Sequence, residues 1–243
     1  MALVTLPKPQ RMTEVQQAIY DQLWHEASAA FAKGHLQVDQ SLANPQYDLR
    51  RGVTLVFRPP PAIQARVKAF LDEVAGIFPG QYFYRPDELH ATVLSIISGT
   101  EHWRSEIRHL RNLRLVIQQA LSGQNAVEFS FQGITASPAA VLIQGFPQGA
   151  GLEAIRGKLR TALTQHGYGH FPDRRYKIRA AHMTAVRFRQ PKINFRQMQA
   201  ALEKHRRTEF GTATIAQIDL IFSDWYASAG TMRILQRYPL RAG

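Results

Sequence analysis

Two periods of apolar residues alternate along this chain and predict helices and strands in turn. Helices are expected where apolar residues recur every three or four positions: 13–33, 61–76, 101–121, 152–165 and 195–205. Strands are expected where β-branched and aromatic residues cluster between turn residues: 53–57, 90–97, 127–134, 139–146, 182–188, 215–222 and 231–240.

The order strand, helix, strand occurs twice, and each time the second strand carries a histidine and a threonine two positions apart. The triplets are His90-Ala91-Thr92 and His182-Met183-Thr184, 92 residues apart. Side chains alternate between the faces of a strand, so the imidazole and the hydroxyl of one triplet point the same way. Two such strands facing each other would place two imidazoles and two hydroxyls around one pocket. That pocket would suit acid–base attack on a phosphodiester.

The context of the triplets is more informative than the pattern itself. The histidine and threonine content of this chain predicts about half a chance match to the His-X-Thr pattern, so the pattern alone is weak evidence. Both triplets, however, continue into apolar strand-like segments, 93–97 and 185–188, and no other histidine has a threonine two places on. The alternative for each triplet is an ordinary polar pair whose hydroxyl is bonded within its own strand.

Composition describes a globular chain without disulfides. With 243 residues, 45% of them hydrophobic, the chain can bury a full core as one large domain or two small lobes. The absence of cysteine excludes disulfide scaffolds, thiol nucleophiles and cysteine-ligated zinc. The apolar run at the start is short for a signal peptide, and no later stretch approaches the ~18 apolar residues of a membrane span. We therefore expect a cytoplasmic protein with no membrane partner.

Positive charge dominates the chain and narrows its expected partners. The formal net charge is +12 and the pI is near 10.4, which favours encounters with polyanions. Arg104, Arg108, Arg111 and Arg114 recur at helical spacing, and a second basic run covers 174–179. Such a stripe can follow a phosphate backbone, although a solvated helix face has the same pattern. RNA or a phosphorylated nucleotide is the expected partner of a protein that we expect to be monomeric.

Two more patterns accompany the triplets. An arginine, Arg187, follows three places after the second threonine, and the chain closes with Ile218-Asp219-Leu220-Ile221-Phe222-Ser223, then Gly230 and Leu235. Together with the triplets, these patterns resemble the two-histidine phosphoesterase superfamily of 2′-5′ RNA ligase-like and cyclic phosphodiesterase proteins. The resemblance covers roughly residues 52–240. It implies an α+β fold of two lobes with pseudo-twofold symmetry, mostly antiparallel sheets flanked by helices, and one triplet on each side of a central groove.

The resemblance also implies a metal-independent phosphoesterase that needs no cofactor. It would cleave, or reversibly form, 2′,3′-cyclic phosphate or 2′-5′ phosphodiester bonds. The side chains agree: imidazoles titrate near neutrality and can act as general base and general acid, so the expected catalytic pair is His90 and His182. Thr92 and Thr184 would donate hydrogen bonds to the phosphate. The sequence leaves open which histidine is the acid, and whether the chain hydrolyses or ligates.

Three further residues are candidates for substrate binding. Arg187 belongs to the second triplet's strand, but strict alternation from His182 points it away from the pocket unless a bulge intervenes. Tyr84 shares parity with His90 and could stack on a base, although Pro86 interrupts the strand and favours a core role. Arg179 ends the basic run.

Domain boundaries follow from where the resemblance begins. We expect an N-terminal helical extension over 1–45 and a bilobal phosphoesterase domain over 46–243.

Other motifs are weaker: Gly149-Ala150-Gly151 fits a loose dinucleotide fingerprint, but Pro147 interrupts the preceding turn. His102, Glu106 and His109 share a helix face where a cation could bind, but a polar rim is the favoured explanation. The competing function is a noncatalytic RNA-binding protein that uses its basic surface.

Overall fold

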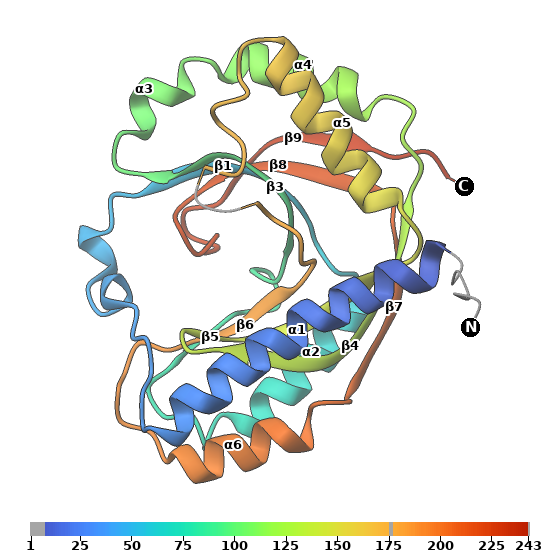
Figure 1. Cartoon of the computed structure of the whole chain (residues 1–243). Helices are drawn as coiled ribbons and strands as arrows, with labels where there is room; N and C mark the ends of the chain where they lie inside the picture. Colours follow the sequence, from blue (N-terminus) through green and yellow to red (C-terminus); the bar gives the residue numbers. More distant parts are fainter. Residues whose placement is uncertain (1–7, 175–176, 243) are drawn as a thin grey trace.

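One curled antiparallel sheet runs through the protein, with helices packed outside it (Figure 1). The computed structural model describes residues 8–174 and 177–242. Its helices are α1 (Lys8–Ala32), α2 (Pro61–Val74), α3 (Trp103–Ile107), α4 (Leu110–Leu121), α5 (Gly151–Gln165) and α6 (Phe195–Lys204). Its strands are β1 (Arg51–Phe57), β2 (Tyr82–Phe83), β3 (Ala91–Thr100), β4 (Val127–Ser137), β5 (Ala140–Pro147), β6 (Met183–Arg187), β7 (Glu209–Ile215), β8 (Gln217–Ser223) and β9 (Arg233–Pro239).

The sheet divides into two lobes at a narrow junction. Its strand order is β7-β4-β5-β6-β3-β1-β8-β9, with β2 paired to β6, and the strands pair antiparallel throughout. The first lobe contains β1, β3, β8 and β9 with α3, α4 and α5, whereas the second contains β2 and β4–β7 with α1, α2 and α6 (Figure 1). Only the pair Ala91↔Met183 joins β3 to β6 in the described chain. The α+β, two-lobed prediction is therefore confirmed.

The helices begin and end where local sequence signals place them. Pro61 opens α2, and the Asn194 side chain accepts a hydrogen bond from the Gln197 backbone N–H at the start of α6. Gly34, with φ of +68°, follows α1 and adopts a backbone conformation that side chains with a Cβ disfavour. Four helices and seven strands thus lie close to their predicted ranges.

One predicted helix needs correction, and one strand was not predicted. The single helix expected over 101–121 is broken by a turn at Arg108 and His109. The turn lets Trp103 of α3 pack on Phe222, with ring centroids 5.0 Å apart, while α4 packs against α5 and β9. The strand β7, at the sheet edge beside β4, was not predicted, since its polar residues and Gly211 weaken the strand pattern.

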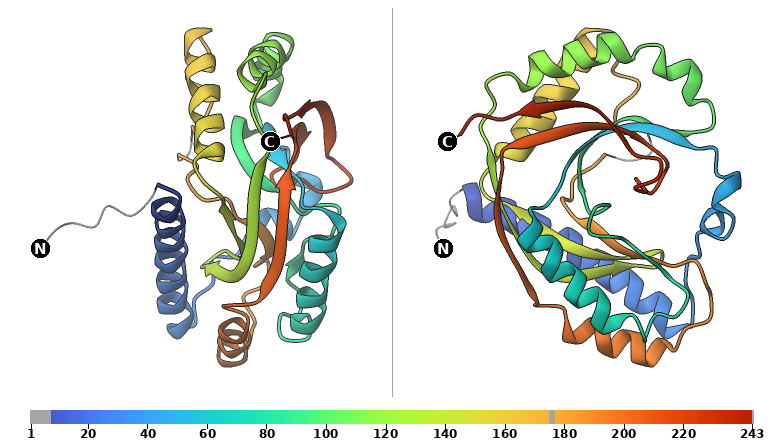
Figure 2. Two further views of the ribbon diagram at one scale, coloured as in Figure 1. Left: turned by 90° about the vertical axis from the view of Figure 1, so that its right-hand side faces the viewer. Right: turned by 180° about the vertical axis from the view of Figure 1, so that it is seen from behind.

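The two lobes and α1 share one continuous core. Phe57 of β1 packs against Phe129 of β4 with ring centroids 4.6 Å apart. From α1, Tyr20, Ala27 and Phe31 are buried, and the helix packs on β4 and β5. In the side view of Figure 2, α1 and α2 lie on opposite sides of the second lobe's strands. The boundary at residue 45 stays a prediction, although α1 is firmly packed on the second lobe.

Candidate active site

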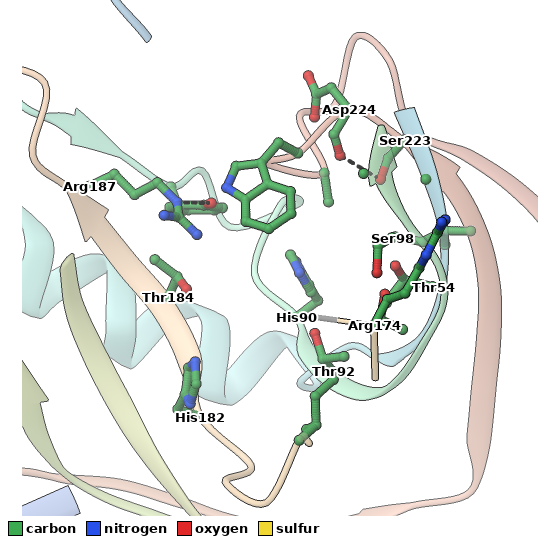
Figure 3. A pocket seen from close by; sticks show the side chains of 18 of the residues that line it. Thr54, His90, Thr92, Ser98, Arg174, His182, Thr184, Arg187, Ser223 and Asp224 are labelled. Carbon is green, nitrogen blue, oxygen red and sulfur yellow. Dashed lines mark hydrogen bonds between the residues drawn. The ribbon is translucent and has the colours of Figure 1, made fainter. Parts of the chain in front are cut away.

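A pocket opens where the two lobes meet, and both triplets line it (Figure 3). Polar side chains dominate its wall. The lining residues that bear on the site are His90, Thr92, His182, Thr184, Arg187, Tyr84, Thr54, Ser95, Ser98, Arg174, Ser223 and Trp225.

The single residue pair that joins β3 to β6 explains why both triplets face this pocket. Ala91 and Met183 lie opposite each other in the antiparallel ladder, and both are fully buried in the core. Residues on either side of a directly opposed pair point to the other face of the sheet. The histidine and the threonine of each triplet therefore point into the same pocket. The histidines stand one residue before β3 and β6, rather than inside the strands as the sequence suggested.

Arg187 also points into the pocket, because β6 contains a bulge. Leu142 pairs with Thr184 but Val141 pairs with Val186, so Ala185 is an extra residue in the ladder. The extra residue reverses the alternation and brings Arg187 to the pocket face. Strict alternation predicted that the Arg187 side chain points away from the pocket, and the bulge is the physical reason that it points into it.

The guanidinium of Arg187 is held by neighbouring aromatic residues. Its Nε donates a hydrogen bond to the Tyr84 hydroxyl at 3.1 Å, and its Cζ lies 5.7 Å from the centre of the Tyr226 ring. Tyr84 itself is buried, with 3% of its surface exposed, yet it lines the pocket. It thus packs in the core, as Pro86 suggested, while its hydroxyl fixes the arginine.

The His90 ring is oriented by its own chain. Nδ1 lies 2.7 Å from the Glu88 carbonyl oxygen, which can only accept, so Nδ1 carries the proton. The neutral ring therefore presents the lone pair of Nε2. Burial lowers the pKa of His90, and the charge of Arg187 lowers it further.

The His182 ring has no such support. Its Nδ1 is buried and has no hydrogen-bond partner among the described residues. Burial, followed by the nearby charge of Arg187, lowers the pKa of the His182 imidazole to about 4. A proton on His90 would lower this pKa further. Both imidazoles are thus neutral at pH 7 in the free protein.

The threonine hydroxyls are free for a ligand. Thr92 and Thr184 are partly exposed, and their hydroxyls form no hydrogen bond with the described chain. A local polar pair, the alternative for each triplet, would show a hydroxyl bonded within its own strand. The arrangement offers two imidazoles for proton transfer, two hydroxyl donors and the guanidinium of Arg187 around one pocket.

The remaining predicted residues lie farther out. Arg179 is exposed, and its carbonyl oxygen accepts hydrogen bonds from Gln16 and Arg156. Arg174, from the same basic run, lines the pocket rim and pairs with Glu106 at 2.5 Å, while 175 and 176 lie outside the described residues. The stripe Arg104, Arg108, Arg111 and Arg114 is exposed along α3, the following turn and α4.

Several pocket residues were missed in the sequence. Thr54, Ser95, Ser98 and Ser223 are hydroxyl residues inside or at the end of apolar strands, and this interruption was the available signal. Trp225 gave no such signal. Its ring packs so closely on Gly99 that a Cβ at residue 99 would lie 2.8 Å from it, so glycine is required there.

The weaker motifs form no site in the described chain. Glu106 pairs with Arg174, and His109 packs against Tyr168 and Phe171. No group of three or more histidine or acidic residues among 8–174 and 177–242 is placed to hold a metal ion. Over the same residues, no helix combines the length and apolar character that membrane crossing requires.

Comparison with known proteins finds likeness in the fold alone. No family model and no curated protein matches the sequence. Among solved structures, TT0787 of Thermus thermophilus matches with a TM-score of 0.60 at 14% identity, over 79% of this chain and 98% of that chain. Escherichia coli LigT in its apo form matches with a TM-score of 0.54 at 14% identity, over the same shares.

A third structure, described as a phosphoesterase, matches with a TM-score of 0.54 at 16% identity, over 79% of this chain and 98% of that chain. Each match spans almost the whole of the known protein, so the likeness covers the complete two-lobed architecture. The chain thus shares its fold with LigT and with a solved phosphoesterase, and this is the fold that its resemblance to the two-histidine phosphoesterase superfamily implies.

Proposed function

We propose that this protein is a metal-independent phosphoesterase that cleaves, or reversibly forms, 2′,3′-cyclic phosphate or 2′-5′ phosphodiester bonds in RNA or nucleotides. The observation that carries the proposal is the convergence of both triplets and Arg187 on one pocket. The groups there match what phosphodiester chemistry needs: two proton-transfer groups, hydroxyl donors and a cation.

The two imidazoles divide the proton transfers. One takes a proton from the attacking water as the new O–P bond forms, and the other gives a proton to the departing ribose oxygen as the old P–O bond breaks. Both rings are neutral in the free protein, so one must gain a proton for this step. The negative charge of a bound phosphodiester opposes the effect of Arg187 and raises the pKa of a neighbouring imidazole. Substrate binding would thereby create the acid.

The remaining groups stabilise the transferred phosphoryl group. Thr92 and Thr184 donate hydrogen bonds to the non-bridging oxygens, and the guanidinium of Arg187 balances their charge. Exchange of the roles of acid and base runs the same steps backward and forms a phosphodiester, so one site supports either direction.

A nucleotide is the favoured ligand class. LigT, which shares the fold, has been crystallised with 3′-AMP and with ATP. The net charge of +12 on this chain favours anionic ligands in the same way. The hydroxyl-rich wall beyond the histidines, formed by Thr54, Ser98 and Ser223, supplies donors and acceptors for a sugar or a base.

Turnover of defined substrates in the presence of EDTA tests the proposal. We expect 2′,3′-cyclic nucleotides or 2′-5′ dinucleotides to be cleaved at the same rate with and without the chelator. Activity that disappears on chelation, and returns with a divalent ion, would contradict the metal-free mechanism. Activity that also survives in the doubly substituted His90→Ala, His182→Ala protein would indicate a contaminating enzyme.

The exposed arginine stripe supports a second function, noncatalytic binding of RNA. Its four arginines are exposed, and the Cζ atom of Arg104 lies 4.5 Å from the centre of the Trp103 ring. This function predicts RNA binding that weakens steeply with salt. It also predicts that neither histidine substitution changes the affinity, whereas substitution of Arg104 and Arg111 lowers it.

A further inference from the structure

Arg156 is a fully buried arginine in the middle of an apolar helix face. It belongs to α5, where its neighbours on the same face are Ile155, Leu159 and Leu163, and none of its surface is exposed. A buried guanidinium loses its hydration, so it is tolerated only when its donors are paired. The proposed chemistry makes no use of this residue, and it does not line the described pocket.

All five N–H groups of Arg156 are paired within the protein. Nε donates to the Val93 carbonyl at 2.9 Å, and Nη2 donates to those of Thr92 at 3.0 Å and Ala180 at 2.8 Å. Nη1 donates to the Arg179 carbonyl at 3.1 Å and to the Glu153 carboxylate at 2.6 Å. Four of the five acceptors are therefore backbone oxygens, two from each triplet-bearing segment.

These acceptors flank the junction between the lobes. Thr92 belongs to the first triplet, and Ala180 lies two residues before His182. The ladder between the two segments consists of the single pair Ala91↔Met183. The chain that leads into β6 makes no ladder pair with β3, and the Arg156 guanidinium fills the place that strand hydrogen bonds would otherwise occupy.

A stable fold alone does not require an arginine at this position. Replacement of a buried charge network by apolar residues of similar volume often leaves stability unchanged or raises it. A guanidinium holds its hydrogen-bond donors in a fixed planar arrangement, whereas an apolar side chain has no donors. At this junction, that geometry fixes two backbone segments relative to each other.

We propose that Arg156 is a positioning residue that sets the separation and orientation of the two triplets by holding the carbonyls of Thr92 and Val93 in register with those of Arg179 and Ala180. The catalytic part of this inference rests on the proposed function, whereas the structural part does not. A misplacement of about 1 Å between reacting groups can lower a rate by about 10²-fold.

Kinetics of Arg156→Met and Arg156→Lys test the catalytic part. We expect Arg156→Met to lower kcat on a 2′,3′-cyclic nucleotide by about 10²-fold and to change KM by less than about threefold, because Arg187 and both threonines remain. Arg156→Lys keeps the charge but has three donors in place of five, so it should recover only part of kcat. Arg206→Met is the matched control, since Arg206 is partly buried, donates to the Ile134 carbonyl and lies away from the pocket.

A distance measurement tests the structural part without any need for turnover. The chain has no cysteine, so Asn112→Cys on α4 and Ala200→Cys on α6 introduce one spin-label site in each lobe, both at exposed positions. We expect the label-to-label distance distribution to shift or broaden in Arg156→Met and to stay unchanged in Arg206→Met.

The outcomes separate the two parts of the inference. An altered distribution in a protein that turns over no phosphodiester would support the positioning of the lobes and refute the proposed function. A folded Arg156→Met protein with wild-type kcat and an unaltered distribution would overturn the positioning role. If Arg156→Met does not fold, the same two measurements on Arg156→Lys decide, since wild-type values there would equally overturn it.

Discussion

The two triplets have the same sequence pattern, but the protein holds them in different ways. His90 is fixed locally, because its ring donates to the carbonyl of Glu88, two residues earlier. The Glu88 carboxylate in turn accepts hydrogen bonds from the Tyr82 hydroxyl and the Arg85 backbone N–H. His182 has no partner for its Nδ1 among the described residues, and the backbone before it is held by distant elements instead.

Tyr20 of α1 provides part of that distant support. Its hydroxyl donates to the Gly145 carbonyl at 2.9 Å and accepts from the backbone N–H groups of Gly145 and Ala181, each at 3.2 Å. Ala181 directly precedes His182, so α1 and α5 both fix the second triplet. Arg156 of α5 also holds the Thr92 carbonyl, so the difference lies in the imidazoles. Each triplet with its supports forms one half-site: the first orients its imidazole through neighbouring sequence, whereas the second holds the backbone before its imidazole through tertiary packing.

Loss of either imidazole should have the largest effect and tests whether the two half-sites are equally necessary. We expect His90→Gln and His182→Gln each to lower kcat by about 10²- to 10⁴-fold, since each removes one proton-transfer group. Steady-state hydrolysis of a 2′,3′-cyclic nucleotide is the measurement, and circular dichroism checks the fold. His25→Gln, at an exposed position of α1, is the control. Full turnover in one of the two variants would confine the chemistry to a single triplet.

Arg187 acts on both half-sites, so its removal should affect them alike. We expect Arg187→Met to lower kcat/KM by about 10²-fold, because it stabilises charge on the phosphoryl oxygens. Its charge lowers the pKa of both histidines, so the variant's pH–rate profile should move to higher pH. A profile that keeps its position would show that this charge does not control the imidazoles.

The lowered pKa of His182 predicts how the stability of the protein changes in acid. His182 has a pKa of about 4 when folded, against 6.5 for an ordinary imidazole, so the unfolded chain binds more protons between these values. Its contribution to stability is complete above pH 6.5 and is lost as the pH falls toward 4, by up to about 3 kcal/mol. Urea unfolding of His182→Gln across this range should show a weaker pH dependence than the wild type. An equal slope would contradict the lowered pKa.

The smallest expected effect is a difference in stability between variants that remove one support of each half-site. Tyr20→Phe leaves the buried N–H of Ala181 unpaired, and we expect it to cost about 2 kcal/mol in the free energy of unfolding. Tyr82→Phe should cost about 1 kcal/mol, because Glu88 still accepts from the N–H groups of Arg85 and Ala229. Chemical denaturation of both variants measures the difference. A larger loss for Tyr82→Phe would reverse the proposed division between local and distant support.

The sequence was informative wherever a signal is local. The alternation around Thr92 and Thr184 predicted that each hydroxyl shares a face with its histidine, and apolar periodicity located α2 and α5 closely. These features depend on strand geometry and helix spacing, which act over a few residues.

Features set by pairing between distant segments were not predictable. The bulge at Ala185, which turns Arg187 into the pocket, exists only in the ladder with β5. The break between α3 and α4 depends on packing against β8, β9 and α5. Tyr20 and Arg156 read as ordinary members of helical patterns, and their contacts with the backbone near His182 involve residues far along the chain.

The packing of α1 has a consequence for how the protein folds. Tyr20 reaches partners that lie 125 and 161 positions later in the chain. Closing such long loops is slow, and chains rich in distant contacts fold more slowly than those rich in local ones. During synthesis, α1 therefore remains without its packing surface until β4, β5 and the segment before His182 have been made. The hydrogen bonds that support the backbone before His182 can therefore form only after the chain has been made past residue 181.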